Sequence, residues 1–304
     1  MKVSGCDCSI VIKTGQKEFD IPYSDETIRE DFILLQEEAA IGGDGVCRGM
    51  RRSNGVTGCM VTPLTIGVVP LMLHIAMGSA GVPVFVSEAR NLYRHSLLLV
   101  PLEDSMSFDL IQERGKNSNE QIAKSNERKL YEGCRVKGFE LRINREETIK
   151  LKLEITGEQP PANYQYNETA RSQISEVSGT EIGRERFSGD YVNYKINCKE
   201  HTNIYGLTLI TKKEGGTKTE VWIKRRLEEG SDIPSVIDEL ETTVRLLRDK
   251  YEYRYFGTFR LKITGLVLVS DETEINAADA VIGPLKYYVT GNVETSVFTN
   301  GSEQ

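Results

Sequence analysis

Residue types that could do acid–base or metal chemistry are few in this chain and widely spaced. The sequence has only three histidines, His74, His95 and His201, and none stands at a metal-ligand spacing from another histidine or a cysteine pair. His95 is the best placed for proton transfer because it lies close to Tyr93, yet no serine or aspartate partner can be assigned to it. A histidine of a strand surface or of the core is the favoured interpretation. Since no nucleophile, base and orienting group can be assembled, the sequence predicts a protein that is not an enzyme.

One cysteine pair could in principle bind a metal ion, and one glycine-rich run could in principle bind phosphate. Cys6 and Cys8 have no second pair, and the six cysteines of the chain are dispersed, so reduced thiols are favoured over a metal site. The run 42–45, Gly-Gly-Asp-Gly, is followed by no Lys-Ser or Lys-Thr pair and preceded by no strong strand, as a phosphate loop would require. A mobile arm is favoured there, and we expect no metal and no cofactor.

Charge and hydropathy restrict the class of protein further. The 304 residues carry 38 Lys and Arg against 45 Asp and Glu, a formal net charge of −7. This balance argues against a dedicated nucleic-acid-binding protein, but it suits a surface past which DNA moves without binding. The longest apolar run, Ile66–Met77, is interrupted by Gly67 and Pro70 and is shorter than the roughly 20 residues of a membrane-spanning helix. We therefore expect no membrane segment, and the N-terminus, which lacks an apolar block, predicts synthesis in the cytoplasm.

A short hairpin and a glycine-rich arm are predicted near the N-terminus. Apolar alternation up to Tyr23 predicts the hairpin, and the apolar spacing over 24–40 predicts a helix. The segment 41–58 contains six glycines and is expected to be mobile or irregular. Three cations of this segment are Arg48, Arg51 and Arg52.

A buried helix is expected next. Apolar residues cover nearly every face of 61–78, where Thr62 and Pro63 fit a cap and a first helical turn. Pro70 should kink or break this helix. Strands are expected over 82–102 and 108–111.

The clearest pattern is a two-faced hairpin over 131–155. Apolar residues alternate with charged ones from Val136 to Ile143 and again from Ile149 to Ile155, with a polar turn between them. Gly138 shifts the alternation as a β-bulge would. The pattern predicts an antiparallel hairpin with one apolar and one charged face.

The second half is predicted to follow a linker. Residues 159–185 are rich in Pro, Asn, Gln, Ser and Glu and indicate a linker or an excursion. Ser231 and Asp232 fit a helix cap, and apolar residues recur at three- and four-residue steps over 232–251, which predicts an amphipathic helix. Strands are expected over 187–196, 204–212, 218–226, 253–269 and 285–297.

Together these elements predict a mainly β fold with a few helices. Residues 1–158 form a first β domain with the glycine-rich arm at about 42–58, residues 159–185 a linker, and residues 186–304 a second β-rich half with one helix. Both halves have a similar order of strands, apolar helix and charged hairpin. This order is consistent with a diverged internal duplication.

Three stretches of the first 160 residues resemble motifs of phage tail tube proteins. They are the apolar segment Pro63–Gly78 with its small-residue end, the strand Tyr93–Ser96 with a Tyr-x-His pair, and the strand pair Leu130–Gly157. The stretch 257–297 fits the closing strands of the same family more loosely. The chain thus resembles the major tail proteins of long-tailed phages or prophages.

The resemblance implies a β-sandwich or barrel-like tail tube fold whose copies form a ring, either a hexamer or a pseudo-hexameric trimer. Rings would stack into a hollow virion tail, or into a tail-derived injection device, and DNA would pass through the lumen without specific binding. The implied partners are other copies of the chain, a tape-measure protein and a tail terminator. At −7 per copy, six copies carry a formal charge of about −42, and an acidic lumen would repel DNA.

The glycine-rich arm and the charged hairpin are the expected assembly elements. Candidate contact residues are Arg48, Arg51, Arg52, Phe139, Arg142, Lys150 and Lys152. The alternative is a β-rich tail or surface adhesion module that binds a ligand through its loops. Such a module should carry exposed aromatic residues in a long loop, and the two long loops offer only Tyr164 and Tyr166.

Overall fold

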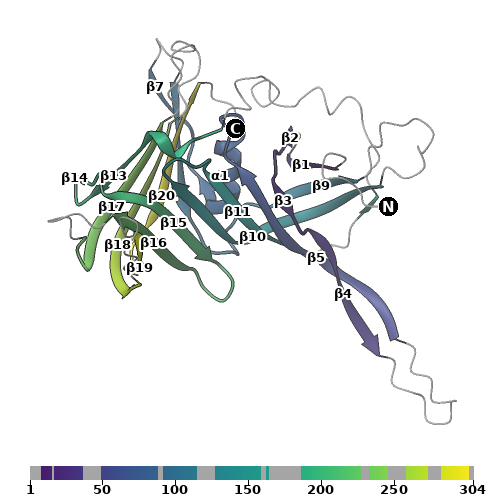
Figure 1. Ribbon diagram of the computed structural model, residues 1–304. Coiled ribbons are helices and arrows are strands. Elements are labelled where there is room, and N and C mark those ends of the chain that lie inside the picture. Colours follow the sequence, from purple (N-terminus) through teal and green to yellow (C-terminus); the bar gives the residue numbers. More distant parts are fainter. Residues whose placement is uncertain are drawn as a thin grey trace, which may run out of the picture.

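Antiparallel strands make up most of the structure, and one long hairpin extends away from the rest of the molecule (Figure 1). The computed structural model describes residues 8–15, 17–36, 49–87, 92–114, 127–158, 162–163, 186–226, 233–245, 258–272 and 282–300. Within these ranges the helices are α1, Val69–Met77, and the single 3-10 turn η3, Gly189–Tyr191. The prediction of a mainly β fold with a few helices is confirmed.

A small sheet is built around the first half of the long strand β10 (Glu127–Asn144). Its strand order is β2, β1, β9, β10 and β12, all antiparallel. The bounds are β1 Cys8–Thr14, β2 Lys17–Asp20, β9 Phe108–Arg114 and β12 Ala162–Asn163. The predicted N-terminal hairpin is confirmed as the β1–β2 pair, and the strand expected at 108–111 is confirmed as part of β9.

The second half of β10 belongs to a large sheet, so this one strand joins both layers. The main order is β4, β5, β11, β10, β15, β16, β19, β18, β17, β13 and β14, while β20, β8, β6 and β7 branch from β18. The short strand β3 also pairs with β5. The bounds are β3 Asp25–Glu26, β4 Arg29–Gln36, β5 Gly49–Pro63, β6 Gly78–Ala80, β7 Val84–Ser87, β8 Leu92–Leu99, β11 Lys150–Gly157, β13 Val192–Ile196, β14 Lys199–Glu200, β15 Ile204–Lys212, β16 Lys218–Arg226, β17 Val236–Arg245, β18 Thr258–Asp271, β19 Ile282–Val289 and β20 Val293–Asn300.

The large sheet closes on itself through the segment that precedes β13. The amide of Phe187 donates to the carbonyl of Leu64, and the amide of Ile149 donates to the carbonyl of Phe187, both at 2.9 Å. On β13, the Tyr194 hydroxyl donates to the carbonyl of Ile143 on β10 at 2.9 Å. These bonds join the β13 side of the sheet to the β10–β11 end, so the strands enclose a barrel-like interior.

The helix α1 fills part of that interior. It packs against β6, β8, β10 and β20, and all its residues except His74 are buried. Pro70 stands in its first turn, where a proline costs no hydrogen bond, so the helix begins there and is not kinked. Gly78 ends it with φ +95°, a left-handed conformation that favours glycine. The prediction of a buried helix is therefore confirmed for 69–77, whereas Thr62 and Pro63 belong to β5.

Two N-terminal predictions are wrong in their described parts. The chain over 24–40 forms β3 and β4 in its described part instead of a helix, because Ile28 is buried while Asp25 and Asp31 stay exposed at the sheet edge. Residues 49–58, expected to be irregular, are part of the 15-residue strand β5. The strand expected over 82–102 is confirmed in part, since this segment contains two strands, β7 and β8, that pair as a hairpin.

The helix predicted over 232–251 is also wrong within its described part. Residues 236–245 form β17, which pairs with β13 on one side and β18 on the other. Buried Ile237, Leu240 and Val244 satisfy a helical step, and they are also buried by a strand whose ladder with β18 is interrupted between Ile237 and Glu239. The β-branched pair Thr242–Thr243 favours the strand. Backbone hydrogen bonds to two neighbouring strands decide between the patterns.

The remaining second-half predictions hold in part. The predicted hairpin of 204–212 and 218–226 is confirmed, and both strands have the predicted bounds. The strand expected over 187–196 is confirmed for 192–196. The segment 285–297 forms two strands, β19 and β20, because the chain turns at 290–292. The linker 159–185 lies outside the described residues apart from β12.

Candidate assembly surface

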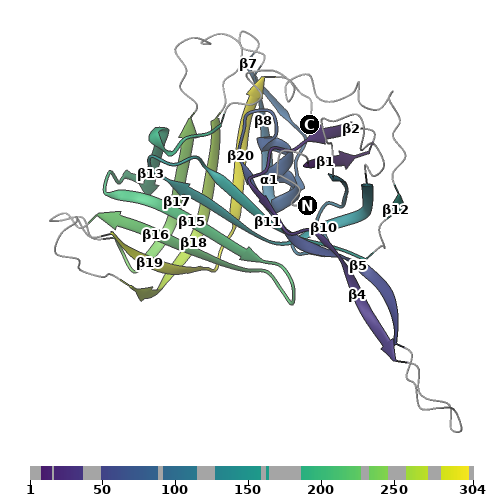
Figure 2. The same cartoon turned by 45° about the vertical axis from the view of Figure 1, so that its right-hand side comes forward.

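The hairpin of β4 and β5, which we call the arm, is the most conspicuous surface feature. Its ladder runs from Arg29 opposite Thr57 to Gln36 opposite Gly49, and both views show it extending away from the sheets (Figures 1 and 2). Among the described residues no third strand pairs with the 49–55 part of β5. The β4 sequence Arg-Glu-Asp-Phe-Ile-Leu-Leu-Gln is apolar toward the end of the strand, and Phe32 is 37% exposed. Because an isolated two-stranded hairpin is marginally stable in water, the arm fits a role in which another chain covers it.

The solvent side of five neighbouring strands forms a second surface, which we call the basic face. It lies on the solvent side of β11, β10, β15, β16 and β19, and most apolar side chains of these strands point into the core. Ile210, Trp222 and Tyr288 are apolar residues that lie on the face itself. Apart from Arg226 at the end of β16, its charged residues are the cations Arg142, Lys150, Lys152, Lys212, Lys218, Lys224 and Lys286 and the acids Glu140, Glu154 and Glu220. Seven cations and three acids give a net charge of +4 on a chain whose total is −7.

One row of this face crosses all five strands without an acid. The register places Lys150, Arg142, Thr208, Trp222 and Lys286 side by side, in that order. The ammonium of Lys286 lies 5.1 Å from the centre of the Trp222 ring, a cation–π contact. The next row supplies two acids. Arg142 forms an ion pair with Glu140, and Lys286 forms one with Glu220 at 3.0 Å.

Like charges oppose each other twice on the basic face. Lys150 stands directly across from Arg142, and Lys212 directly across from Lys218. Directly opposite like charges destabilise an antiparallel pair by roughly 0.2–1 kcal/mol. Folding of the single subunit therefore gains nothing from this arrangement.

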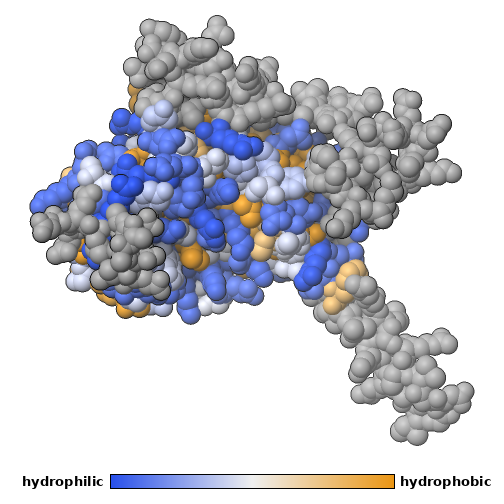
Figure 3. Space-filling model, viewed as in Figure 1, coloured by the Kyte–Doolittle hydropathy of each residue, from blue (hydrophilic) through white to orange (hydrophobic). Residues whose placement is uncertain are grey.

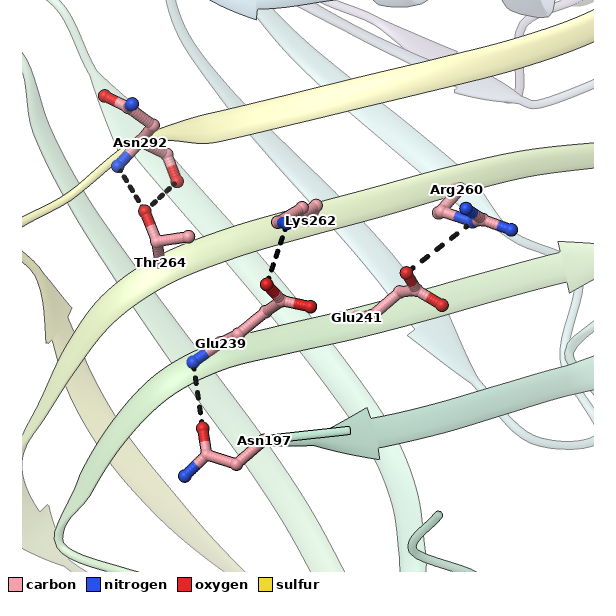
Figure 4. A network of polar contacts seen from close by, with 7 residues as sticks. All are labelled: Asn197, Glu239, Glu241, Arg260, Lys262, Thr264 and Asn292. Carbon is pink, nitrogen blue, oxygen red and sulfur yellow. Dashed lines mark hydrogen bonds and ion pairs between the residues drawn. The ribbon is translucent and has the colours of Figure 1, made fainter. Parts of the chain in front are cut away.

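The far part of the same sheet shows the opposite arrangement (Figure 4). There Lys262 binds Glu239 at 2.7 Å, and Arg260 lies 3.7 Å from Glu241. Lys262 also stands directly across from Glu241 on one side and Glu294 on the other. The hydrogen bond to Glu239 raises the pKa of Lys262. In this region the cation Lys262 stands directly across from acids, whereas the basic face combines two ion pairs, Arg142–Glu140 and Lys286–Glu220, with two directly opposed like-charge pairs.

The sequence-predicted assembly residues fall into three groups. Arg142, Lys150 and Lys152 lie together on the basic face. Phe139 is 3% exposed and packs in the core. It precedes Glu140 on the strand, so its side chain points to the opposite side of the sheet, and it is not a surface residue of the subunit. Arg51 and Arg52 lie on β5 in the arm, opposite Leu34 and Ile33, and Arg48 lies outside the described residues.

Sequence reasoning missed the acidic edge and the distant members of the basic face. Asp25, Glu26, Glu30 and Asp31 lie on β3 and β4, which the sequence assigns to a helix. Lys286 is brought beside Trp222 only by the β16–β19 ladder. The position of Lys286 between the apolar residues Leu285 and Tyr287, which are both buried, is the local signal that could have found it. Figure 3 shows that hydrophilic residues dominate one side of the body, with scattered apolar residues among them.

Burial favours the neutral forms of two ionisable groups in the interior. Burial lowers the pKa of His95 on β8, and it raises the pKa of the Cys134 thiol to about 12. His95 is therefore a core histidine, as one of the two sequence interpretations holds. Among the described residues, no three His, Cys, Asp or Glu side chains cluster to hold a metal ion.

Lys213 is a buried lysine directly behind the end of the basic face. Its ammonium donates to Ser105 Oγ at 2.9 Å and to the Met77 carbonyl at the C-terminal end of α1 at 3.2 Å. Burial lowers its pKa to about 8. A cation suits a helix C-terminus, so Lys213 connects β15 to α1.

The comparisons with known proteins add no relative. No protein-family model matches this chain, and no curated protein matches it. Across the described ranges, none of the helices has the length and apolar character needed to traverse a bilayer.

Proposed function

We propose that this chain is a structural subunit of a phage or prophage tail, whose copies assemble into rings that stack as a hollow tube for DNA. The observation that carries the proposal is the arm. A two-stranded hairpin that leaves the body and has an apolar sequence needs a partner, and in a self-assembling subunit that partner is another copy.

The resemblance of segments 63–78, 93–96 and 130–157 to tail tube proteins supports the same function. Those segments correspond to the helix α1 with the end of β5, to β8, and to the β10–β11 hairpin. They lie around one core, and the charged side of the hairpin is free to contact another subunit. A tape-measure protein, a tail terminator and passing DNA belong to this proposal as its partners.

The test shortens the arm without disturbing the body. Deletion of 42–58 is unsuitable, because residues 56–58 pair with β11 and Val56 is in the core. Replacing residues 34–51 with Asn-Gly instead joins Ile33 to Arg52, which already face each other across the ladder, through a favoured two-residue turn.

We expect the purified wild-type chain to form rings or tubes in negative-stain electron microscopy across a concentration series. The shortened variant should keep the melting transition of the subunit and stay small by light scattering. The control replaces Glu214–Gly216, the exposed β15–β16 turn, with Asn-Gly and should assemble. A wild-type chain that remains a small species at high concentration, even with a seed complex, would refute the tube and favour the adhesion module.

A further inference from the structure

We infer that the basic face is a docking site for a second copy of this chain, which presents the acidic residues of its β3–β4 edge. We call these residues the acidic strip: Asp25, Glu26, Glu30 and Asp31, with Arg29 among them, a formal net charge of −3. Asp25 and Asp31 are its exposed acids, whereas Glu26 stands across from buried Met60 and accepts hydrogen bonds from Gln112 Nε2 at 3.0 Å and from the Ile28 amide at 2.9 Å. The inference rests on the proposed self-assembly and specifies which surfaces meet.

The first argument is the excess of cations that remains on the face beside its two ion pairs, Arg142–Glu140 and Lys286–Glu220. Lys150 opposite Arg142 and Lys212 opposite Lys218 cost folding free energy, whereas the Lys262 region shows that this sheet can pair opposite charges. A cost retained on one surface is explained if anionic groups arrive there from outside and relieve the repulsion.

The second argument is complementarity in charge and size. The face has a net charge of +4 and the strip −3. Five strands at about 4.8 Å spacing make the basic row about 19 Å long, and the six residue steps from Asp25 to Asp31 at about 3.3 Å span about 20 Å. Asp25 and Asp31 are exposed, so the strip can reach across the row.

A nucleic acid fits the face less well. Three acids, Glu140, Glu154 and Glu220, lie between cations on the same strands of the face. A phosphate backbone that bound the cations would also contact these acids. The total charge of −7 also opposes the approach of a polyanion. The acidic strip, in which Arg29 stands among acids, matches this mixed face better than the uniform negative charge of a phosphate backbone.

The geometry has a consequence for assembly. The strip lies at the β3–β4 edge beyond β5, and the face lies on β11 to β19, so the two patches are different parts of one sheet. A contact between different patches is heterologous, and repeated contacts of this kind close into a ring or continue as a filament.

The experiment uses charge reversal in the full chain. The face variant, K150E/K218E/K224E, changes the face from +4 to −2, and the strip variant, D25K/D31K, changes the strip from −3 to +1. K150E and K218E each convert a like-charge pair into an opposite-charge pair, so the face variant should melt no lower than wild type as a monomer. A matched control, R94E/R186E/K199E, makes the same change in total charge at exposed positions elsewhere.

We expect each variant to raise the concentration needed for association at least about 100-fold, because like-charge juxtaposition costs several kcal/mol and 1.4 kcal/mol is tenfold. The combined five-site variant should recover most of the loss, and the control should behave as wild type. Association of the wild type should weaken between 50 mM and 0.5 M salt.

The outcomes separate this inference from the proposed function. If wild type assembles and the face variant assembles equally well, or the combined variant recovers nothing, the docking contact is refuted and the tube stands. If association depends on these charges but electron microscopy shows only dimers or open chains, the contact stands and the tube fails. A wild type that never associates refutes both. A 30-base-pair DNA that binds wild type and not the face variant, while self-association is unchanged, identifies nucleic acid as the anion instead.

Discussion

The buried lysine Lys213 makes a sharp prediction about stability and pH. Burial lowers its pKa to about 8 from the ordinary 10.5. Below pH 8 the lysine is charged in both the folded and the unfolded chain, so the folded chain bears the full cost of the buried charge. As the pH rises from 8 to 10.5 the folded chain loses the proton first, and stability increases.

The magnitude follows from the two pKa values. Their difference, at about 1.4 kcal/mol per pH unit, amounts to about 3 kcal/mol. In the K213M variant this pH-dependent cost is absent. Few hydrogen bonds are lost, because Ser105 Oγ still donates to the Pro101 carbonyl and the Met77 carbonyl still accepts from the Val100 amide.

Urea denaturation of both chains between pH 7 and 10.5, at a concentration that keeps them monomeric, measures the effect. The stability of K213M relative to wild type should be highest at pH 7 and fall by about 3 kcal/mol toward pH 10.5. The neighbouring residue Lys212 supplies the control, since K212M removes an exposed cation and leaves the buried one in place. A K213M difference that does not change with pH would refute the reasoning.

Three further predictions test other parts of the fold. Gly78→Ala should cost about 2 kcal/mol or more in unfolding free energy, because φ is +95° and the added Cβ would lie 2.6 Å from Ser105 Oγ; an unchanged urea midpoint would contradict this. Cys134 should be alkylated at pH 8 at least about 100-fold more slowly than exposed Cys198, as peptide mass spectrometry can measure, because burial and the charge of Asp109 raise its pKa to about 12; equal rates would show that β10 opens readily. Tyr194→Phe should lower thermal stability by about 1 kcal/mol through loss of the bond to the Ile143 carbonyl, and a neutral effect would mean that this bond does not hold the barrel closed.

The sequence predicted the elements whose pattern is local. The β10–β11 hairpin with its bulge at Gly138 and the β15–β16 hairpin were both identified, because a period of two with one apolar side is visible within about 20 residues. The same pattern placed Arg142, Lys150 and Lys152 correctly on one exposed face.

Elements with an ambiguous pattern were assigned wrongly. Buried Ile237, Leu240 and Val244 are spaced three and four apart, as on a helix, yet a strand whose ladder is interrupted between Ile237 and Glu239 buries the same residues. The acidic and apolar mixture over 24–40 gave a similarly false helical spacing. In both cases pairing with a neighbouring strand, which local sequence does not contain, overrode the local preference.

The amino-acid sequence by itself determined the mainly β character and the two charged hairpins, because these depend on alternation between adjacent residues. Only the tertiary structure decided that Lys213 is buried under α1, that Phe139 is in the core, and that Lys286 joins the row of Arg142. Register between strands far apart in the chain sets these neighbours, and a shift of one residue would move each side chain to the other face of the sheet.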